Sequence, residues 1–510
     1  MKVPPWTAPL ALTFALRLPW LGSTPNPAGD EGNWAMLALR LSRGLDAALP
    51  PDAAFVTTAF ARLIAWSFRL FGPSFASARA VLVAALALTV IAVARWCERP
   101  REALAIGLVV ALHPWSVMWS RTVCVPYALA LSLGVIGPLA WLDALRTRRW
   151  WSVLLASQLL GAAMHFSPLA LIPIGACALW AIHQRLSWRL VPLALSGLVH
   201  AAPLVAGVLS AMRVGRQTVA PLSTPLIERL STMTATLLGD IAGTSTAAHF
   251  AGCSRAELRL GVLVGICLIA AVFAYARRGD DRARYAALHM AVALVATPLL
   301  LVPARAWSMP VIDADRYGFA LVAPLALAVG GFAASTRGWR LFAAVFALWL
   351  ACVTGGVARH FVRGSHGGDL GLFVSRDGGR YRGWQIARER RPLPDLIRDA
   401  VIEDARGEPA VIVYEDYAFH ALRFSLALRG GDRGITYAYG VPEKPRGARM
   451  YFVMWSEGAF SADYRPRATA AAARAFRARV MGGYDDLRRV RAFETPGGES
   501  LCELWSAQAR

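Results

Sequence analysis

The stretch Pro27-Ala-Gly-Asp30-Glu31-Gly-Asn-Trp34 places two adjacent carboxylates just after the first apolar segment of the chain, Pro5 to Leu21. That segment is long enough to cross a bilayer, although Arg17 interrupts it. After the acidic pair, apolar residues recur at helical spacing as far as Leu41. Carboxylates beside a membrane surface are usually solvated, so their meaning depends on the rest of the chain.

Composition identifies the class of protein. The chain has 510 residues, of which 56% are hydrophobic and only 17% are charged. Nearly uncharged apolar runs of about 20 residues recur along it, which is typical of a polytopic α-helical membrane protein. The net charge of +21 comes from arginine, because lysine occurs only at Lys2 and Lys444. The arginines are dispersed, which disfavours nucleic acid and favours membrane lipids or a phosphate-bearing substrate as partners.

The apolar runs predict about eleven membrane helices. They lie near residues 6–23, 77–96, 103–119, 124–143, 150–165, 167–183, 189–210, 258–276, 286–303, 317–335 and 339–358. Arginine is concentrated in alternate short loops, and such loops are cytoplasmic. This places the N-terminus inside and the Asp30–Glu31 loop outside. With an odd number of spans, everything after residue 359 also lies outside.

Two of the outward loops are long. Residues 24–76 contain two amphipathic stretches, Asn33–Leu45 and Val56–Phe71, which predict helices on the membrane surface. Residues 211–257 are rich in Ser and Thr and contain a short helical stretch near Leu226–Leu238. Long loops over a helical bundle are suited to building a substrate site.

The chain changes character after the last span. We predict two domains, a membrane domain at residues 1–358 and an external α/β domain at residues 359–510. The predicted strands are Ala410–Glu415, Met450–Trp455, Leu487–Phe493 and Ser500–Trp505, and the predicted helices are Ala418–Leu428 and Ala468–Met481. This region has no Gly-rich phosphate loop and no metal-ligand cluster, which indicates an accessory domain.

Several motifs occur in a defined order. They are Asp30-Glu31, Pro50-Pro51, Leu70-Phe-Gly-Pro73, Ser77-Ala-Arg79, His113-Pro114, Ser120-Arg121, Pro126-Tyr127 and Asp315-Arg316-Tyr317 with Pro324 following. In this order and spacing the chain resembles the GT-C glycosyltransferases, especially the protein O-mannosyltransferase and lipid A aminoarabinose transferase branch. The resemblance runs from the N-terminus to about residue 335, and the α/β tail is similar to the external domain of that family.

The resemblance implies transfer of a sugar from a polyprenyl-phosphate donor on the periplasmic face of a bacterial inner membrane. By resemblance, Asp30 is the catalytic base, and Glu31 binds the sugar or assists. Arg316 and Arg121 would hold the lipid phosphate, with Tyr317 as a hydrogen-bonding neighbour. These residue types suit the chemistry, since a carboxylate can accept the acceptor's proton and cations can stabilise a leaving phosphate. The sequence assigns no metal ligand, and it leaves open the cofactor, any divalent metal requirement and the acceptor, whether lipid, glycan or protein.

One departure from the family and two alternative functions stay open. Many relatives have a Lys or His before the paired prolines, whereas this chain has Leu49-Pro50-Pro51-Asp52. Arg305 or an arginine of the 211–257 loop is a candidate replacement, and a catalytically inactive relative is the other explanation. A lipid-sugar transporter or flippase would show internal repeats and broken helices, which we do not find clearly. An O-antigen polymerase or ligase would not carry an acidic pair directly after its first span.

The predicted topology can be tested with reporter fusions. A reporter enzyme that is active only in the cytoplasm, fused after Arg510, is expected to be silent, because the arginine pattern places the C-terminus outside. The same reporter fused in the loop after Arg146 serves as the positive control. Activity at Arg510 would contradict the orientation.

Overall fold

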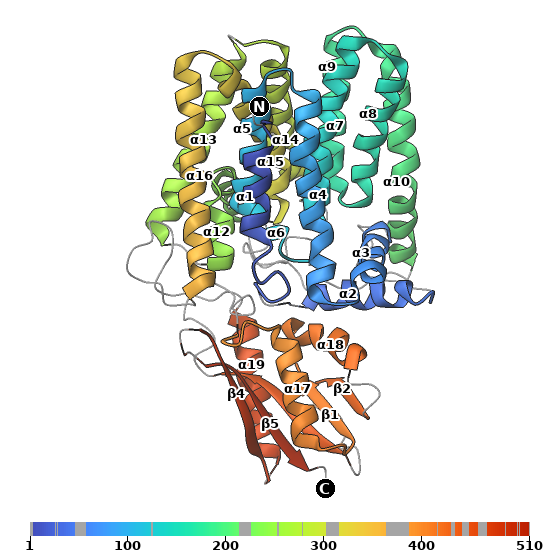
Figure 1. The fold of residues 1–510 in the computed structure, drawn as a ribbon, viewed down its shortest axis with the longest axis vertical. Coiled ribbons are helices and arrows are strands. Elements are labelled where there is room, and N and C mark those ends of the chain that lie inside the picture. Colours follow the sequence, from blue (N-terminus) through green and yellow to red (C-terminus); the bar gives the residue numbers. More distant parts are fainter. Residues whose placement is uncertain are drawn as a thin grey trace.

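The structure, a computed structural model of the whole chain, has a bundle of long helices with a smaller sheet-containing unit at one end (Figure 1). It describes residues 4–25, 27, 29–45, 58–123, 126–213, 226–251, 254–277, 279–301, 316–363, 387–415, 417–429, 434–440, 448–456, 467–484, 486–496, 498 and 500–508. The N-terminus lies at the end of the bundle farthest from the sheet-containing unit (Figure 1).

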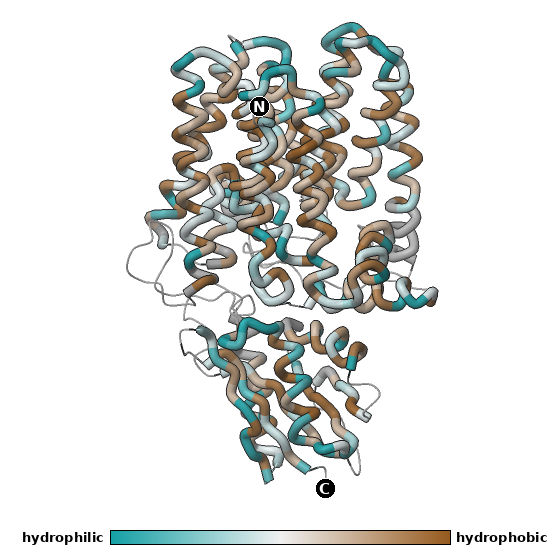
Figure 2. The backbone as a smooth tube through the Cα atoms, in the orientation of Figure 1, coloured by the Kyte–Doolittle hydropathy of each residue, from teal (hydrophilic) through white to brown (hydrophobic). Residues whose placement is uncertain are grey.

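The long helices of the bundle run roughly side by side (Figure 1). They are α1 (Thr7–Arg17), α4 (Phe75–Trp96), α5 (Pro100–Leu112), α7 (Tyr127–Thr147), α8 (Trp150–Ala162), α9 (Leu171–His183), α10 (Leu190–Arg213), α13 (Arg255–Ala276), α14 (Asp281–Leu301), α15 (Phe319–Ala334) and α16 (Arg337–Arg363). Figure 2 shows hydrophobic residues along the middle of these helices and hydrophilic residues at their turns.

Each predicted membrane span overlaps one of these helices. Within the described residues, five helices are long and apolar enough to cross a membrane. They are Phe75–Trp96, Tyr127–Thr147, Ala256–Ala276, Arg316–Ala334 and Arg337–Arg359. Pro168–His183 and Leu190–Pro203 are shorter apolar helices. The structure is therefore mainly helical with several membrane-crossing helices, and the total of about eleven spans stays a prediction.

Shorter helices lie between the long ones. They are α2 (Gly29–Ser42), α3 (Ala59–Phe71), α6 (Pro114–Trp119), α11 (Leu226–Ile241) and α12 (Thr244–Ala251). The helices expected in the first long loop are present as α2 and α3, which lie at the end of the bundle that faces the sheet-containing unit (Figure 1). On α3, Phe60, Ile64 and Phe68 are buried while Trp66 and Leu70 are exposed, as expected for a helix with one face on the bundle and the other at a lipid interface.

Arg17 explains how a charged residue is tolerated in the first apolar segment. Its side chain is fully buried, and its guanidinium donates to the carbonyls of Val110 (3.1 Å) and Ala111 (3.0 Å) at the end of α5. It also donates to the hydroxyls of Ser116 (3.0 Å) and Ser120 (2.9 Å). The last carbonyls of a helix have no partner within the helix and carry partial negative charge. Arg17 therefore ties α1 to the end of α5 and to α6.

The C-terminal unit contains a five-stranded sheet with the order β2-β1-β3-β5-β4. Its strands are β1 (Ala410–Tyr414), β2 (Ile435–Tyr439), β3 (Arg449–Trp455), β4 (Arg488–Glu494) and β5 (Ser500–Gln508). β1 pairs in parallel with β2 and β3, whereas β5 pairs antiparallel with β3 and β4. The predicted α/β character of this region is confirmed.

Helices cover both faces of this sheet. The C-terminal helices are α17 (Leu393–Ala405), α18 (Leu422–Arg429) and α19 (Arg467–Gly483). Ile397 of α17 shares one core with Ile412 of β1, while Phe476 of α19 shares another with the neighbouring residue Val413. Successive strand residues point to opposite faces, so the continuous apolar run in β1 is buried on both sides.

Two glycines of α13 set its distance from α11 and from the start of α12. A Cβ on Gly265 would lie 2.2 Å from the carbonyl oxygen of Leu238, and one on Gly261 would lie 2.6 Å from the Cβ of Thr244. Small residues spaced four apart allow membrane helices to approach closely. This contact fixes the end of α11, which carries Asp240.

We expect Gly265→Ala to push α13 away from α11 and lower the free energy of unfolding by about 1–3 kcal/mol, the usual cost of overpacking. Thermal unfolding of the detergent-purified protein measures the effect. Gly355→Ala on α16 is the matched control, because a Cβ there meets nothing within 4 Å. Equal unfolding temperatures for the two variants would contradict this account of the packing.

Candidate functional site at the start of α2

The acidic pair lies in the first turn of α2, which begins at Gly29. The sequence had placed the pair in the loop before the helix, so the structure moves the helix start toward the N-terminus. Carboxylates are favoured at this position because the first turn of a helix carries partial positive charge. Consecutive helix residues point about 100° apart, so the two side chains face different surroundings.

Glu31 is fully buried and forms a two-bond ion pair with Arg79 of α4. Its oxygens accept from Nε of Arg79 at 3.1 Å and from Nη2 at 2.6 Å. The backbone N–H of Val123 also donates to Glu31, and Arg79 donates from Nη1 to the Leu21 carbonyl at 2.8 Å. Glu31 therefore joins α2 to α4 and to the segment after α6. These contacts favour an anchoring role, and the sugar-binding role stays a prediction.

Arg79 is the structural partner that the sequence did not assign. It stands in the second turn of an apolar helix, where a charged side chain is costly unless it is paired. An arginine at that position of the sequence was the feature that could have predicted a buried acidic partner. Both side chains of the pair are 0% exposed, so neither charge is compensated by water.

Asp30 is partly buried and faces a different group of residues. Asp30, Arg316 and Tyr317 all lie close enough to interact electrostatically with the hydroxyl of Tyr127. Three segments that are far apart in the sequence therefore meet here: the start of α2, the start of α7 and the turn before α15. The sequence predicted that Arg316, Tyr317 and Arg121 converge with the acidic pair in one outward-facing cavity, and this convergence stays a prediction.

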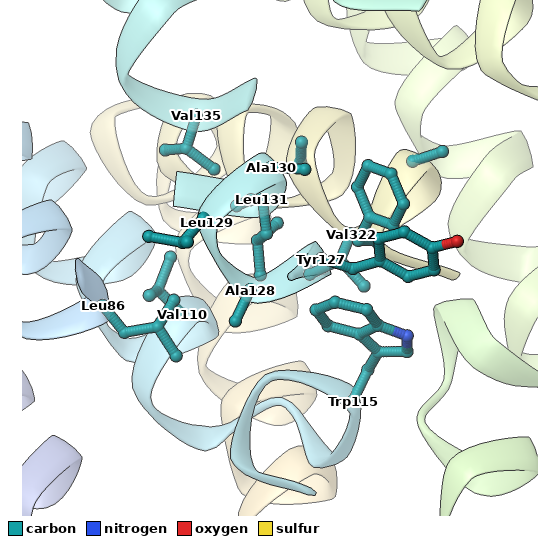
Figure 3. Close-up of a cluster of buried hydrophobic side chains, with 14 of the residues drawn as sticks. Leu86, Val110, Trp115, Tyr127, Ala128, Leu129, Ala130, Leu131, Val135 and Val322 are labelled. Carbon is teal, nitrogen blue, oxygen red and sulfur yellow. The ribbon is translucent and has the colours of Figure 1, made fainter. Parts of the chain in front are cut away.

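Arg316 and Tyr317 form a compact pair before α15. Nη2 of Arg316 donates to the Tyr317 hydroxyl at 3.2 Å, and the guanidinium lies 5.1 Å from the ring centre of Tyr317. The Tyr317 ring is 5.6 Å from that of Tyr127, which in turn is 5.2 Å from Phe319. Figure 3 shows Tyr127 and Trp115 beside one another in a cluster of buried hydrophobic side chains. The aromatic side chains thus form a rigid support for the guanidinium.

Tyr127 is a member of this cluster to which the sequence had given no role. It appeared there only within the Pro126-Tyr127 motif that opens a span. A tyrosine at the end of a membrane helix is usually an interfacial residue, so composition alone gave no reason to place it beside a carboxylate and a guanidinium.

Arg121 is bound to backbone carbonyls near the end of α1. Its guanidinium donates to four backbone carbonyls of the α1 end and the α1–α2 connection, those of Leu16 (2.7 Å), Arg17 (3.0 Å), Pro19 (2.6 Å) and Thr24 (3.0 Å). Burial, followed by the nearby charge of Arg79, lowers the pKa of Arg121 to about 9, so it stays charged at neutral pH. The four bonds favour a structural role, and its contact with a lipid phosphate stays a prediction.

Asp240 lies against the start of α15. It is fully buried, and one of its oxygens accepts from the Thr246 hydroxyl at 3.1 Å. A Cβ on Gly318 would come within 2.7 Å of the other oxygen. The absence of a side chain at Gly318 therefore lets α11 pack against the turn that carries Arg316 and Tyr317.

Solved structures with a similar fold exist. ArnT from Cupriavidus metallidurans bound to undecaprenyl phosphate matches over 98% of this chain and 97% of its own, with a TM-score of 0.52 and 13% sequence identity. The apo state of the same ArnT matches over 98% and 96%, with a TM-score of 0.52 and 14% identity. The chain has a GT-C fold.

One further solved structure was matched, whereas two comparisons of the sequence found no match. The arabinofuranosyltransferase AftD from Mycobacteria matches over 99% of this chain but 40% of its own, with a TM-score of 0.41 and 14% identity. No protein-family model and no curated protein matches the sequence. The two ArnT matches confirm, at the level of the fold, the resemblance to GT-C glycosyltransferases that the motifs predicted.

Some parts of the site predicted from the sequence belong to segments that the structure does not describe. The segments that contain Pro50-Pro51, Arg305 and Asp315 lie outside the described residues. Within the described part of the chain, no group of three or more His, Cys, Asp or Glu side chains is arranged to hold a metal ion. The question of a divalent metal stays open, as it was for the sequence.

Glu31→Gln is expected to lower the free energy of unfolding by about 3–5 kcal/mol, because it leaves the Arg79 charge buried without a counter-charge. Thermal unfolding in detergent measures the loss. Glu494→Gln is the matched control, since its partner Arg388 is 69% exposed and surface ion pairs contribute only about 0–1 kcal/mol. If both variants unfolded at the same temperature, Glu31 would not be an anchor. Adding Arg79→Gln to Glu31→Gln is expected to recover part of the loss.

Proposed function

We propose that the protein is a membrane glycosyltransferase that moves a sugar from a polyprenyl-phosphate donor to an acceptor on the periplasmic face. The fold supports this proposal, because it is shared along 98% of the chain with ArnT, a protein whose structure was determined with undecaprenyl phosphate bound. A fold can host many activities, so the argument for this function rests on the site.

The proposal is supported by two observations. The Tyr317 ring, whose hydroxyl accepts from Arg316, lies 5.6 Å from the ring of Tyr127, and Asp30 lies close enough to the Tyr127 hydroxyl to interact with it electrostatically. Sugar transfer from a lipid phosphate needs a proton acceptor and a cation that are no farther apart than the length of one sugar-phosphate group. The first turn of α2 supplies a carboxylate, and the turn before α15 supplies a guanidinium with an adjacent hydroxyl. These groups come from different loops, so the fold is required to assemble them.

In the proposed reaction, an acceptor hydroxyl attacks the anomeric carbon of the sugar while Asp30 takes its proton. The new bond joins the acceptor oxygen to the anomeric carbon. The bond between that carbon and the phosphate oxygen breaks, and polyprenyl phosphate leaves with the electron pair. The reaction is neither an oxidation nor a reduction, and no further reactant is needed.

Arg316 and Tyr317 are proposed to bind the phosphate of the donor. The leaving group gains negative charge as its bond to the sugar breaks, and a charge-assisted hydrogen bond from a guanidinium stabilises that charge. Glu31 supports the reaction indirectly in this proposal, because its ion pair with Arg79 fixes the helix turn that carries Asp30. Arg121 supports the same turn from the α1–α2 connection.

Two observations favour the periplasmic side for this chemistry. Arginine-rich short loops between membrane helices are usually cytoplasmic. The acidic pair follows the first predicted span, so this pattern favours the opposite, periplasmic side for the pair. The C-terminal unit lies at the same end of the bundle as α2 (Figure 1). The acceptor is a lipid, glycan or protein that can reach this end of the molecule.

Asp30→Asn is expected to lower turnover by roughly 100-fold or more, because it removes the general base while keeping the size of the side chain. The assay follows the release of polyprenyl phosphate from a panel of radiolabelled polyprenyl-phosphate sugars by the purified protein. Asp143→Asn is the control, since Asp143 forms a surface ion pair with Arg146 (2.8 Å) in α7. Donor binding is expected to be largely retained in both variants.

Two results would count against the proposal. Transfer by Asp30→Asn at the wild-type rate would remove Asp30 as the base and make Glu31 or Asp240 the next residue to test. Movement of intact lipid-linked sugar across vesicles without release of polyprenyl phosphate would instead indicate a transporter.

A further inference from the structure

The C-terminal unit contacts α2 beside the acidic pair. The short helix η8 (Tyr417–Ala421) passes so close to α2 that a Cβ on Gly32 would lie 2.5 Å from the Cα of Ala421 and 2.7 Å from the carbonyl oxygen of His420. Real Cβ atoms do not approach backbone atoms this closely. The contact therefore requires glycine at this position, which directly follows Glu31 and is two residues from Asp30.

A second contact is made by an aromatic side chain of α18. Phe424 is fully buried and stacks on Phe68 of α3 at 5.6 Å between ring centres, and it meets Phe75 of α4 edge-on at 4.9 Å. Phe424 and Ala421 belong to the hydrophobic core of the bundle, whereas Leu422 between them belongs to the core of the sheet-containing unit. One short segment therefore connects the two cores.

A third contact lies on the connection that leads into α2. The guanidinium of Arg390 is 4.5 Å from the ring centre of Trp20 and also donates to the carbonyl of Val362. Trp20 precedes Leu21, whose carbonyl accepts from Arg79. The C-terminal unit thus contacts both the helix that carries the acidic pair and the segment before it.

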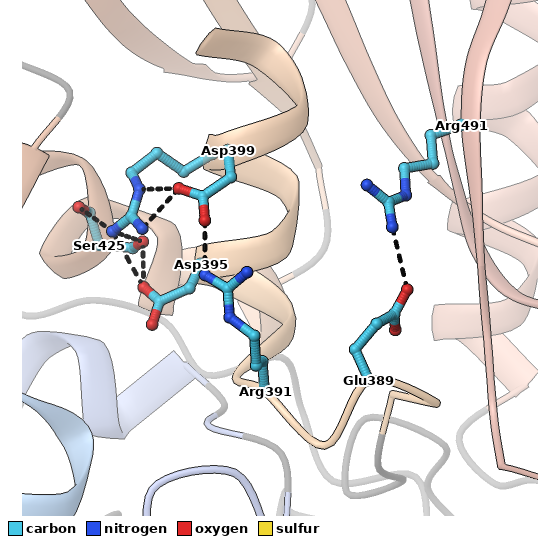
Figure 4. A network of polar contacts seen from close by, with 7 residues as sticks. Glu389, Arg391, Asp395, Asp399, Ser425 and Arg491 are labelled. Atoms are coloured by element: carbon cyan, nitrogen blue, oxygen red, sulfur yellow. Dashed lines mark hydrogen bonds and ion pairs between the residues drawn. The ribbon is translucent and has the colours of Figure 1, made fainter. Parts of the chain in front are cut away.

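Within the C-terminal unit, a polar network fixes α18 against α17 (Figure 4). Arg398 is buried, and its Nη1 donates to the carbonyl (3.1 Å) and the hydroxyl (3.0 Å) of Ser425. The Ser425 hydroxyl donates to Asp395 at 2.6 Å. Phe424 is therefore held by the residue next to it, and its position is set by the whole unit.

We propose that the C-terminal unit is a positioning element of the active site, which holds the first turn of α2 and with it Asp30. Gly32 and Phe424 are positioning residues in this account, since they act through the backbone of α2 and do not contact substrate. This inference rests on the proposed function for its effect on transfer. Its structural part, that docking of the unit orders the first turn, can be measured without any substrate.

The structural part is tested by hydrogen exchange on the full-length protein in detergent. In an α-helix the amides of Asn33 and Trp34 bond to the carbonyls of Gly29 and Asp30, so they report on the first turn. We expect Gly32→Ala and Phe424→Leu to speed exchange at these amides by about 10-fold or more, because local stability falls. Gly175→Ala, where a Cβ meets nothing within 4 Å, is the matched control and is expected to exchange like wild type. Unchanged exchange in both variants would overturn the proposal.

The catalytic part is tested by transfer kinetics of the same variants. Misplacing Asp30 is expected to lower kcat by roughly 10- to 100-fold, with little change in KM for the lipid donor, because a small displacement of a reacting group is costly. Faster exchange with a wild-type kcat would overturn the positioning role. If wild type transferred no sugar from any donor, the proposed function would fail, and the exchange result alone would decide whether the unit holds this turn.

Discussion

The buried ion pair between Glu31 and Arg79 is the interaction on which the rest of this site depends. A charged side chain in an apolar helix needs a partner of opposite charge, and the partner must come from a segment that can be buried beside it. Here that segment is the first turn of α2, whose own dipole favours a carboxylate. Arg17 adds hydrogen bonds to backbone carbonyls at the end of α5, and Arg121 adds hydrogen bonds to carbonyls at the end of α1 and in the α1–α2 connection. Arginines thus serve as structural ties at the end of the bundle that bears the acidic pair.

This constraint explains why two neighbouring carboxylates have different roles in our account. Because consecutive helix residues point about 100° apart, fixing Glu31 toward Arg79 leaves Asp30 pointing in another direction, where it lies close enough to Tyr127 to interact with it electrostatically. The ion pair between Glu31 and Arg79 therefore orients the neighbouring carboxylate of Asp30, which is partly exposed and is not part of the pair. The C-terminal unit completes the arrangement from the opposite side, through Gly32 and Phe424. A catalytic group on a short surface helix gains a fixed position when it is held from both sides.

Sequence patterns predicted the helices and strands better than they predicted the contacts between side chains. Long apolar runs and alternating amphipathic stretches are local signals, so the bundle helices, α2, α3 and most strands were found. The strand β2 and the helix α17 were missed, since each follows a Gly-rich, charged region of the chain. The sequence predicted Arg316 and Arg121 as phosphate-binding cations at the outward ends of spans. Their surroundings differ, with Tyr317 beside one and four carbonyls around the other, and that difference depends on tertiary packing.

The central claim is that Arg316 and Asp30 form one site for a polyprenyl-phosphate donor. A cryo-EM structure of the purified protein with undecaprenyl phosphate tests it most directly. We predict the phosphate within hydrogen-bonding distance of the Arg316 guanidinium, about 2.7–3.2 Å, on the side of α2 that carries Asp30. A phosphate bound at the opposite end of the bundle, or held by other cations with Arg316 turned away from it, would contradict the account.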